Sequence, residues 1–442
     1  MVKSGVLSAI FFATALCTAQ AAEPAITQFA LPNGMAVVVI PDHRAPVVTQ
    51  MIWFKVGAMD DPPGLSGLAH FFEHMMFRGT KTVPGDQFAR SVARNGGETN
   101  AFTTHDYTAF YEQIARDRLK LAMDLEADRM ANLDLSDANV NTERDVVLEE
   151  RRLRTENNPQ ALADEQVNAA LYLSHPYGRP VIGWPGEIRH IGRIEAQDFY
   201  SHHYAPNNAI LIVAGDVAPD DVRALAGTTF GHVAARPLLP RVDFAQPARL
   251  GETRLNITDP NAKVAIFSRD YRVTSYAEAA PGKAEALEVL AALLGADATG
   301  ALYRKLVVER RLATDAGASY DGDARDDGEF NVYAVPALGV SLETIERAVD
   351  EVIAQFTQRP PPIADLARVK TQLVASAIYQ RDNLYTLAST YGQALAIGLT
   401  VEDVRSWPRR IAAVPAKNVL AAASASLIKR EAVTLYLKPG QR

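Results

Sequence analysis

The chain has 442 residues, of which 48% are hydrophobic and 22% are charged, an ordinary composition for a soluble globular protein of two or three domains. Its formal net charge is −7, and an acidic balance of this size argues against nucleic acid as the main partner. Cys17 is the only cysteine, and it lies in an N-terminal segment that we expect to be removed. Disulfides and cysteine metal ligands are therefore not expected in the mature protein.

The N-terminus has the pattern of a secretory signal peptide. Lys3 supplies one positive charge, an apolar run extends from Gly5 to Cys17, and Ala19-Gln20-Ala21 is a small-x-small cleavage pattern. We expect residues 1–22 to be the signal peptide, which implies a periplasmic or secreted protein. A membrane anchor is the alternative, but the apolar run is short for a bilayer span. No membrane span is expected after signal removal.

The first half of the mature chain begins with strand patterns and continues mainly with helical ones. Strands are predicted at 34–40 and 47–56, followed by an apolar helix at 66–77. Further elements are helices at 136–156 and 159–172 and a strand at 209–214.

Residues 233–249 are rich in proline, arginine and alanine, show no periodicity, and are interpreted as a linker. The second half then repeats the order of elements: strands at 255–257 and 262–269, helices at 284–294 and 300–310, mixed strands to residue 335, helices at 341–357 and 363–380, and a strand at 432–437. We predict an α+β fold of two homologous tandem domains, 26–232 and 250–440, each a mostly antiparallel sheet packed with helices.

The nine histidines all lie at or before His232, so the predicted chemistry belongs to the first half. His70-Phe71-Phe72-Glu73-His74 is an H-x-x-E-H pattern, the inverse of the usual zincin motif. On a helix the two histidines lie one turn apart on one face and can bind one ion. Glu73 can hold a metal-bound water and take its proton. Two core histidines with hydrogen-bond partners are the alternative, but this set is costly to bury without a cation.

A catalytic zinc needs a third protein ligand, and the helix at 136–156 offers candidates. Glu143 and Glu150 are seven residues apart, so they share a face with Val146 and Val147 that we expect to point inward. From helical phase alone, Glu143, Glu149 and Glu150 all remain candidates, and a charged surface helix is the alternative.

These motifs resemble the pitrilysin or insulinase family of zinc metallopeptidases, and within it the single-motif, processing-peptidase-like bacterial branch. The resemblance covers essentially the whole mature chain. The family's E-R-x-V-x-x-x-E segment reads here from Glu143 to Glu150. The resemblance implies that His70, His74 and Glu150 bind one Zn²⁺ per chain. It gives Glu143 a supporting role beside one histidine.

The resemblance also implies peptide substrates. The segment Asn100-Ala101-Phe102 is similar to the family's edge strand, which pairs with the substrate backbone; an ordinary aromatic-rich strand is the alternative. The family closes a chamber from four such domains, which implies a dimer with a second copy or with a homologous non-catalytic chain. The segment from Leu306 to Tyr320 departs from the family pattern, because Val307 and Thr314 stand where an Arg and a Tyr are expected.

The sequence therefore predicts a secreted zinc endopeptidase that hydrolyses peptides or unfolded segments, with Glu73 as the general base. Two alternatives remain open. One is a non-catalytic peptide-binding or assembly subunit with the same fold, and the other is a metal-dependent hydrolase acting on something other than peptides.

Overall fold

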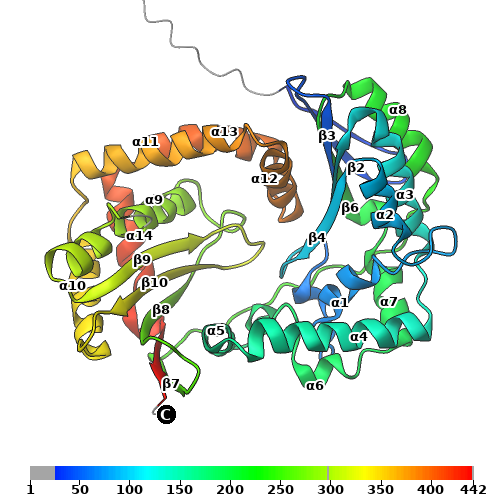
Figure 1. Ribbon diagram of the computed structural model, residues 1–442. Coiled ribbons are helices and arrows are strands. Elements are labelled where there is room, and N and C mark those ends of the chain that lie inside the picture. Colours follow the sequence, from blue (N-terminus) through cyan, green and yellow to red (C-terminus); the bar gives the residue numbers. More distant parts are fainter. Residues whose placement is uncertain (1–24, 296–297, 441–442) are drawn as a thin grey trace, which may run out of the picture.

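The computed structural model describes residues 25–295 and 298–440, so the expected signal peptide lies outside the described residues. Each half of the chain contains one mixed sheet (Figure 1). The strands of the first half are β1 (Thr27–Ala30), β2 (Ala36–Pro41), β3 (Val47–Phe54), β4 (Glu98–Thr103), β5 (Thr108–Ala115) and β6 (Ala209–Gly215). Those of the second half are β7 (Thr253–Asp259), β8 (Ile266–Val273), β9 (Ala313–Asp321), β10 (Gly328–Pro336) and β11 (Val433–Pro439).

The two sheets have the same topology. The first runs β1-β2-β6-β3-β5-β4 and the second β7-β11-β8-β10-β9, so the orders match once β1 is set aside. Each sheet has one parallel pair, β2 with β6 in the first and β7 with β11 in the second, and every other pair is antiparallel. The predicted α+β fold of two similar, mostly antiparallel units is confirmed.

Helices cover both sheets. In the first half they are α1 (Leu68–Met75), α2 (Gln87–Arg94), α3 (Leu119–Asn132), α4 (Asp137–Arg151), α5 (Pro159–Leu171), α6 (Pro185–Ile188), α7 (Arg193–His203) and α8 (Pro219–Thr229). In the second they are α9 (Lys283–Gly295), α10 (Leu342–Gln358), α11 (Ile363–Gln380), α12 (Leu384–Ala396), α13 (Val401–Ala413) and α14 (Ala416–Ser426). The helix predicted at 136–156 ends earlier as an α-helix and continues as a wider turn over Arg152–Glu156.

The two halves exchange helices. From the first half, α5 packs through Val167 and Leu171 against β11 of the second sheet. From the second half, α12 packs against β3 and β6 of the first sheet (Figure 1). There it approaches Trp53. Gly392 makes this approach possible, because a Cβ there would come within 2.0 Å of the Trp53 ring. The sequence patterns did not predict α12 or its position.

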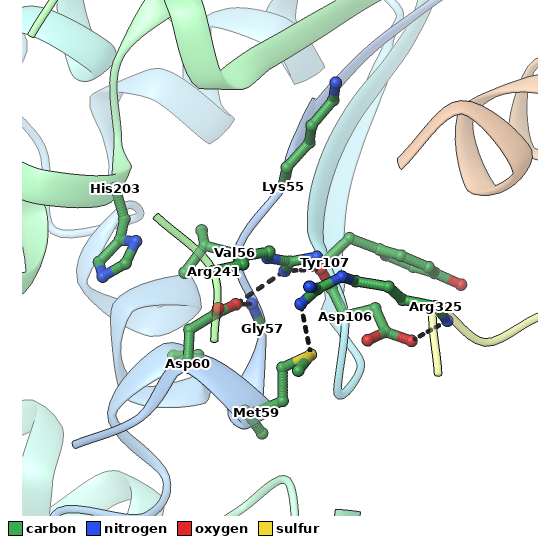
Figure 2. Close-up of polar contacts among 12 residues, drawn as sticks. Lys55, Val56, Gly57, Met59, Asp60, Asp106, Tyr107, His203, Arg241 and Arg325 are labelled. Carbon is green, nitrogen blue, oxygen red and sulfur yellow. Dashed lines mark hydrogen bonds and ion pairs between the residues drawn. The ribbon is translucent and has the colours of Figure 1, made fainter. Parts of the chain in front are cut away.

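Polar contacts also join the halves beside this exchange (Figure 2). Arg241, in a stretch without helix or strand, pairs with Asp60 at 2.7 Å and donates to the carbonyl of Asp106. Arg325, between β9 and β10, donates its backbone N–H to the Asp106 carboxylate at 3.0 Å and approaches the Met59 sulfur. The connection and the β9–β10 loop are thus both bound to the first half.

The first sheet is buried on both faces. Its central strand β6 is apolar and buried along its whole length, as expected for a strand packed on two sides. One face carries the core that includes α1, and the other carries the core that includes α12. None of the helices in the described residues has the length and apolar character needed to cross a membrane.

Candidate metal centre

Helix α1 is held in place by its apolar residues and by its N-terminus. Leu68, Phe71 and Phe72 are fully buried in the core of the first half. The carboxylate of Asp61 accepts hydrogen bonds from the backbone N–H groups of Gly67 at 2.7 Å and Ala69 at 2.8 Å, which satisfies donors that a helix leaves free at its start.

The residue before α1 must be glycine. Gly67 has φ of 91°, and a Cβ there would lie 2.5 Å from the Ile182 carbonyl oxygen. The rigid start of α1 fixes the direction in which His70 and His74 project from the helix.

Helix α4 lies against α1 and is fixed by its buried side. Val140 and Val147 are buried, and Arg151 forms a buried ion pair with Glu165 at 2.8 Å. The prediction for Val146 was wrong: its side chain is 41% exposed. Only a narrow stripe of the helix faces inward, and Val146 is about 100° away from Val147 around the axis.

The two helices bring together the three predicted ligands. His74 Nε2 lies 3.0 Å from Glu150 Oε2, and His70 Nε2 lies 3.7 Å from the same oxygen. One nitrogen from each histidine and one Glu150 oxygen all lie within 4.8 Å of one another. Glu149 lies outside this group, is 51% exposed on its side chain, and pairs with Arg152.

This donor set fits a zinc ion. Glu150 Oε2 is buried and accepts no hydrogen bond from the residues that the structure describes, although two imidazoles lie beside it. Two imidazole nitrogens and one carboxylate oxygen are a ligand set of catalytic zinc sites. Burial lowers the pKa of His70 to about 4, with His74 acting in the same direction. Contact with His74 lowers the pKa of Glu150. Neutral histidine and ionised glutamate are the forms that bind a metal.

Other charged residues orient these groups. Glu143 is buried, and its Oε2 lies 3.2 Å from His74 Nδ1, while its other oxygen contacts Arg78. Arg154 Nη1 lies 2.6 Å from Glu150 Oε1, so the other carboxylate oxygen, Oε2, points toward the histidines. The sequence interpretation missed Arg78 and Arg154, although the i,i+4 spacing of Glu150 and Arg154 was a signal for the second.

Glu73 lies on α1 between the two histidines. The Thr103 hydroxyl, at the end of β4, donates a hydrogen bond of 2.6 Å to Glu73 Oε2. Burial raises the pKa of Glu73, and the hydrogen bond from Thr103 partly offsets this. A carboxylate with a raised pKa and a fixed orientation is suited to accept a proton. Thr103 was not among the predicted site residues.

Strand β4 is the edge of the first sheet beside α1. The backbone N–H of Thr104 donates to the carbonyl of Tyr107, across the hairpin that joins β4 to β5. Backbone groups of successive residues in an antiparallel strand point alternately toward the paired strand and away from it. The N–H and C=O groups of Ala101 and Thr103 therefore point toward the open edge. The side chain of Ala101 packs on the α1 side, whereas Phe102 packs against Trp53 on the opposite face, with ring centroids 5.4 Å apart. Asn100 shares the face of Phe102.

This fold and donor set define a metallopeptidase class. Residues 36–184 match the family described as insulinase (peptidase family M16), and residues 190–373 match the M16 inactive domain. The chain belongs to the insulinase family of peptidases, M16. It is 34% identical to an uncharacterized zinc protease of Mycobacterium tuberculosis over 314 residues, which are 69% of this chain and 68% of the relative. It is 26% identical to the zinc protease PqqE of Helicobacter pylori, over 95% of this chain and 94% of the relative.

Two solved structures show the same fold. A protease from Helicobacter pylori superposes with a TM-score of 0.89 at 25% identity, covering 94% of this chain and all of the other (100%). The periplasmic protease PqqL from Escherichia coli superposes with a TM-score of 0.80 at 18% identity, covering 94% of this chain but only 48% of PqqL. The fold of this chain therefore corresponds to about half of PqqL.

Proposed function

We propose that this protein is a zinc-dependent endopeptidase with one Zn²⁺ per chain, held by His70, His74 and Glu150. The proposal rests on the meeting of these three side chains at the buried Oε2 of Glu150, which accepts no hydrogen bond within the described part of the chain. A bound zinc ion would supply Lewis acidity and lower the pKa of a coordinated water. Glu73 is placed to take a proton from that water and pass it to the leaving amine.

The substrate is proposed to be a peptide or an unfolded segment. The open edge of β4 offers the backbone groups of Thr103 and the C=O of Ala101, while the N–H of Ala101 donates to the Asn100 side chain at 2.9 Å. An extended peptide can add at this edge as a further strand. Because Thr103 also bonds Glu73, a backbone bound at this edge lies beside the general base. Phe102 packs on the face of the sheet opposite α1, so we propose that Asn100 and Phe102 contribute to β4 itself and not to direct contact with the substrate.

We assign the catalytic unit to residues 26–232, the connection to 233–249 and the second unit to 250–440. The signal peptide expected at 1–22 and the similarity in fold to the periplasmic protease PqqL support a periplasmic or secreted location. Since the fold spans about half of PqqL, we propose a dimer, with a second copy or with a homologous non-catalytic chain. The hydroxyl of Tyr320 donates to the Thr274 carbonyl at 2.7 Å, so it is already engaged within the second half.

The proposal is tested by digesting a peptide library with residues 23–442, with and without a chelator, beside a Glu73→Gln variant. Cleavage that the chelator abolishes, and that the variant lacks while keeping its metal, is expected. Stoichiometric zinc without cleavage by the chain alone, with cleavage restored by a homologous chain, would support the mixed dimer. A wild-type protein without stoichiometric zinc would instead favour the non-catalytic peptide-binding subunit.

A further inference from the structure

The second half contains a cavity of about 450 Å³ that the proposed peptidase chemistry does not use. It is bounded by α9, α11, α12 and α13, and all of its lining residues lie between positions 276 and 410. Neither α1, α4 nor β4 contributes to it, so it is separate from the metal centre. Its volume is within the usual range for small-molecule sites.

Glu288 of α9 lines this cavity, and its carboxylate is held by neutral donors. The hydroxyl of Tyr276 donates to Glu288 Oε2, and the indole N–H of Trp407 lies 3.2 Å from the same oxygen and 2.9 Å from the Tyr276 hydroxyl. Both donors use one oxygen, and no residue that the structure describes donates to Oε1. The carboxylate is thus oriented but not neutralised.

No lysine or arginine of the described chain forms an ion pair with Glu288. Its neighbour Glu285, one turn earlier on the same helix, pairs with Arg410 at 2.6 Å. Arg410 also lies 3.4 Å from Asp403, so this cation is already shared between two acids. Of these two carboxylates on α9, Glu285 thus has a cationic partner, Arg410 of α13, whereas Glu288 forms no ion pair within the described residues.

The charges facing the cavity favour a cation near Glu288. Asp323, in the loop between β9 and β10, adds a second carboxylate and has no ion pair among the described residues. Burial raises the pKa of Glu288 to about 7, and the negative charge of Asp323 acts in the same direction. Two arginines, Arg381 and Arg410, also line the cavity. Arg381, at the end of α11, forms no ion pair within the described chain. A positively charged ligand would offset the repulsion between the two carboxylates.

The remaining wall combines aromatic and aliphatic side chains with polar ones, among them Ser376, Thr390 and Gln393. Tyr276, Trp407 and Tyr391 line the cavity together with Leu373 and Leu387. Aromatic rings around a carboxylate recognise organic cations through charge and cation–π attraction.

We propose that this cavity binds a primary ammonium ligand that carries an apolar group, with its nitrogen at Glu288 and its apolar part between the aromatic and leucine side chains. Tyr276 and Trp407 position the carboxylate. The proposal does not depend on the peptidase activity, because the two sites share no residue.

The test is calorimetric titration of the metal-loaded chain, residues 23–442, with phenethylamine at pH 8. The isosteric alcohol 2-phenylethanol and the anion 3-phenylpropionate are the ligand controls. Phenethylamine is expected to bind once per chain, and Glu288→Gln is expected to weaken binding by more than about tenfold, as loss of a charge partner does. Glu309→Gln, an exposed glutamate of the same half paired with Lys305, is the matched variant and should bind as the wild type does.

A second readout guards against misfolding of Glu288→Gln. The indole N–H resonance of Trp407, identified with Trp407→Phe, should shift when wild-type protein is titrated with phenethylamine and not with the alcohol. Absence of saturable binding, equal binding of the alcohol or the anion, or unchanged affinity in Glu288→Gln would overturn the proposal.

Discussion

Replacing Glu143 by Gln tests how far the metal centre depends on residues that do not touch the ion. Glu143 is 3% exposed and lies between His74 Nδ1, at 3.2 Å, and Arg78. Glutamine keeps the shape but has one oxygen, so it can accept from His74 or from Arg78 but not from both in the same way. The variant should fold and should hold His74 less firmly.

The magnitude follows from these contacts. Loss of a residue that orients a metal ligand typically weakens metal binding 10–100-fold, or about 1.4–2.7 kcal/mol. Because the Arg78 side chain is 35% exposed, water can take over part of its lost contact, so we predict a loss near the lower limit, about tenfold.

Zinc affinity would be measured by competition with a chromogenic chelator. Glu149→Gln is the matched control on the same helix, since Glu149 is exposed and bonded only to Arg152 in the described chain, and it should bind zinc as the wild type does. Equal zinc affinity in Glu143→Gln and the wild type would refute the role of Glu143.

Three further predictions concern stability. Gly392→Ala should lower the melting temperature and loosen the contact between the halves, because its Cβ would meet the Trp53 ring; limited proteolysis and thermal unfolding would show this, and an unchanged melting temperature would contradict it. Glu346→Gln should cost about 1.5–3 kcal/mol, because the buried Arg269 then keeps Asp350 as a charge partner but loses Glu346. Burial alone would raise the pKa of Glu346, but hydrogen bonds, of which that from Arg254 is the strongest, hold the pKa well below 4.5. The wild type should therefore lose this stability as the pH falls below 4.5, while the variant should not. Chemical denaturation across acidic pH checks both expectations. Asp61→Ala should cost about 1–2 kcal/mol at the start of α1 and weaken zinc binding, as followed by denaturation and chelator competition; full retention of both would contradict the capping role.

The grouping of the two histidines was predictable because their spacing is local. His70 and His74 are four residues apart on one helix, and this spacing alone brings two imidazoles to one point. The choice of Glu150 over Glu149 was not settled by helical phase and came from the resemblance. In the structure Glu149 is turned to solvent and Glu150 to the histidines, so a difference of one residue separates a surface ion pair from a ligand position.

The parts that could not be predicted depend on contacts between distant residues. Thr103 reaches Glu73 only because β4 lies beside α1, and nothing in the sequence around either residue indicates that pairing. The position of α12 depends on Gly392 meeting Trp53 from the other half. Val146 was misplaced because hydrophobicity was taken as a sign of burial, whereas a helix packed along one narrow stripe leaves apolar residues at the edge of that stripe exposed.

Zinc content across four proteins tests the central claim most directly. Elemental analysis of purified wild type, Glu73→Gln, Glu149→Gln and Glu150→Gln should find one zinc per chain in the first three and little in Glu150→Gln. Peptide cleavage measured on the same samples should be lost in both Glu73→Gln and Glu150→Gln. A wild type without zinc, or a Glu149→Gln variant that loses the metal while Glu150→Gln keeps it, would contradict the account.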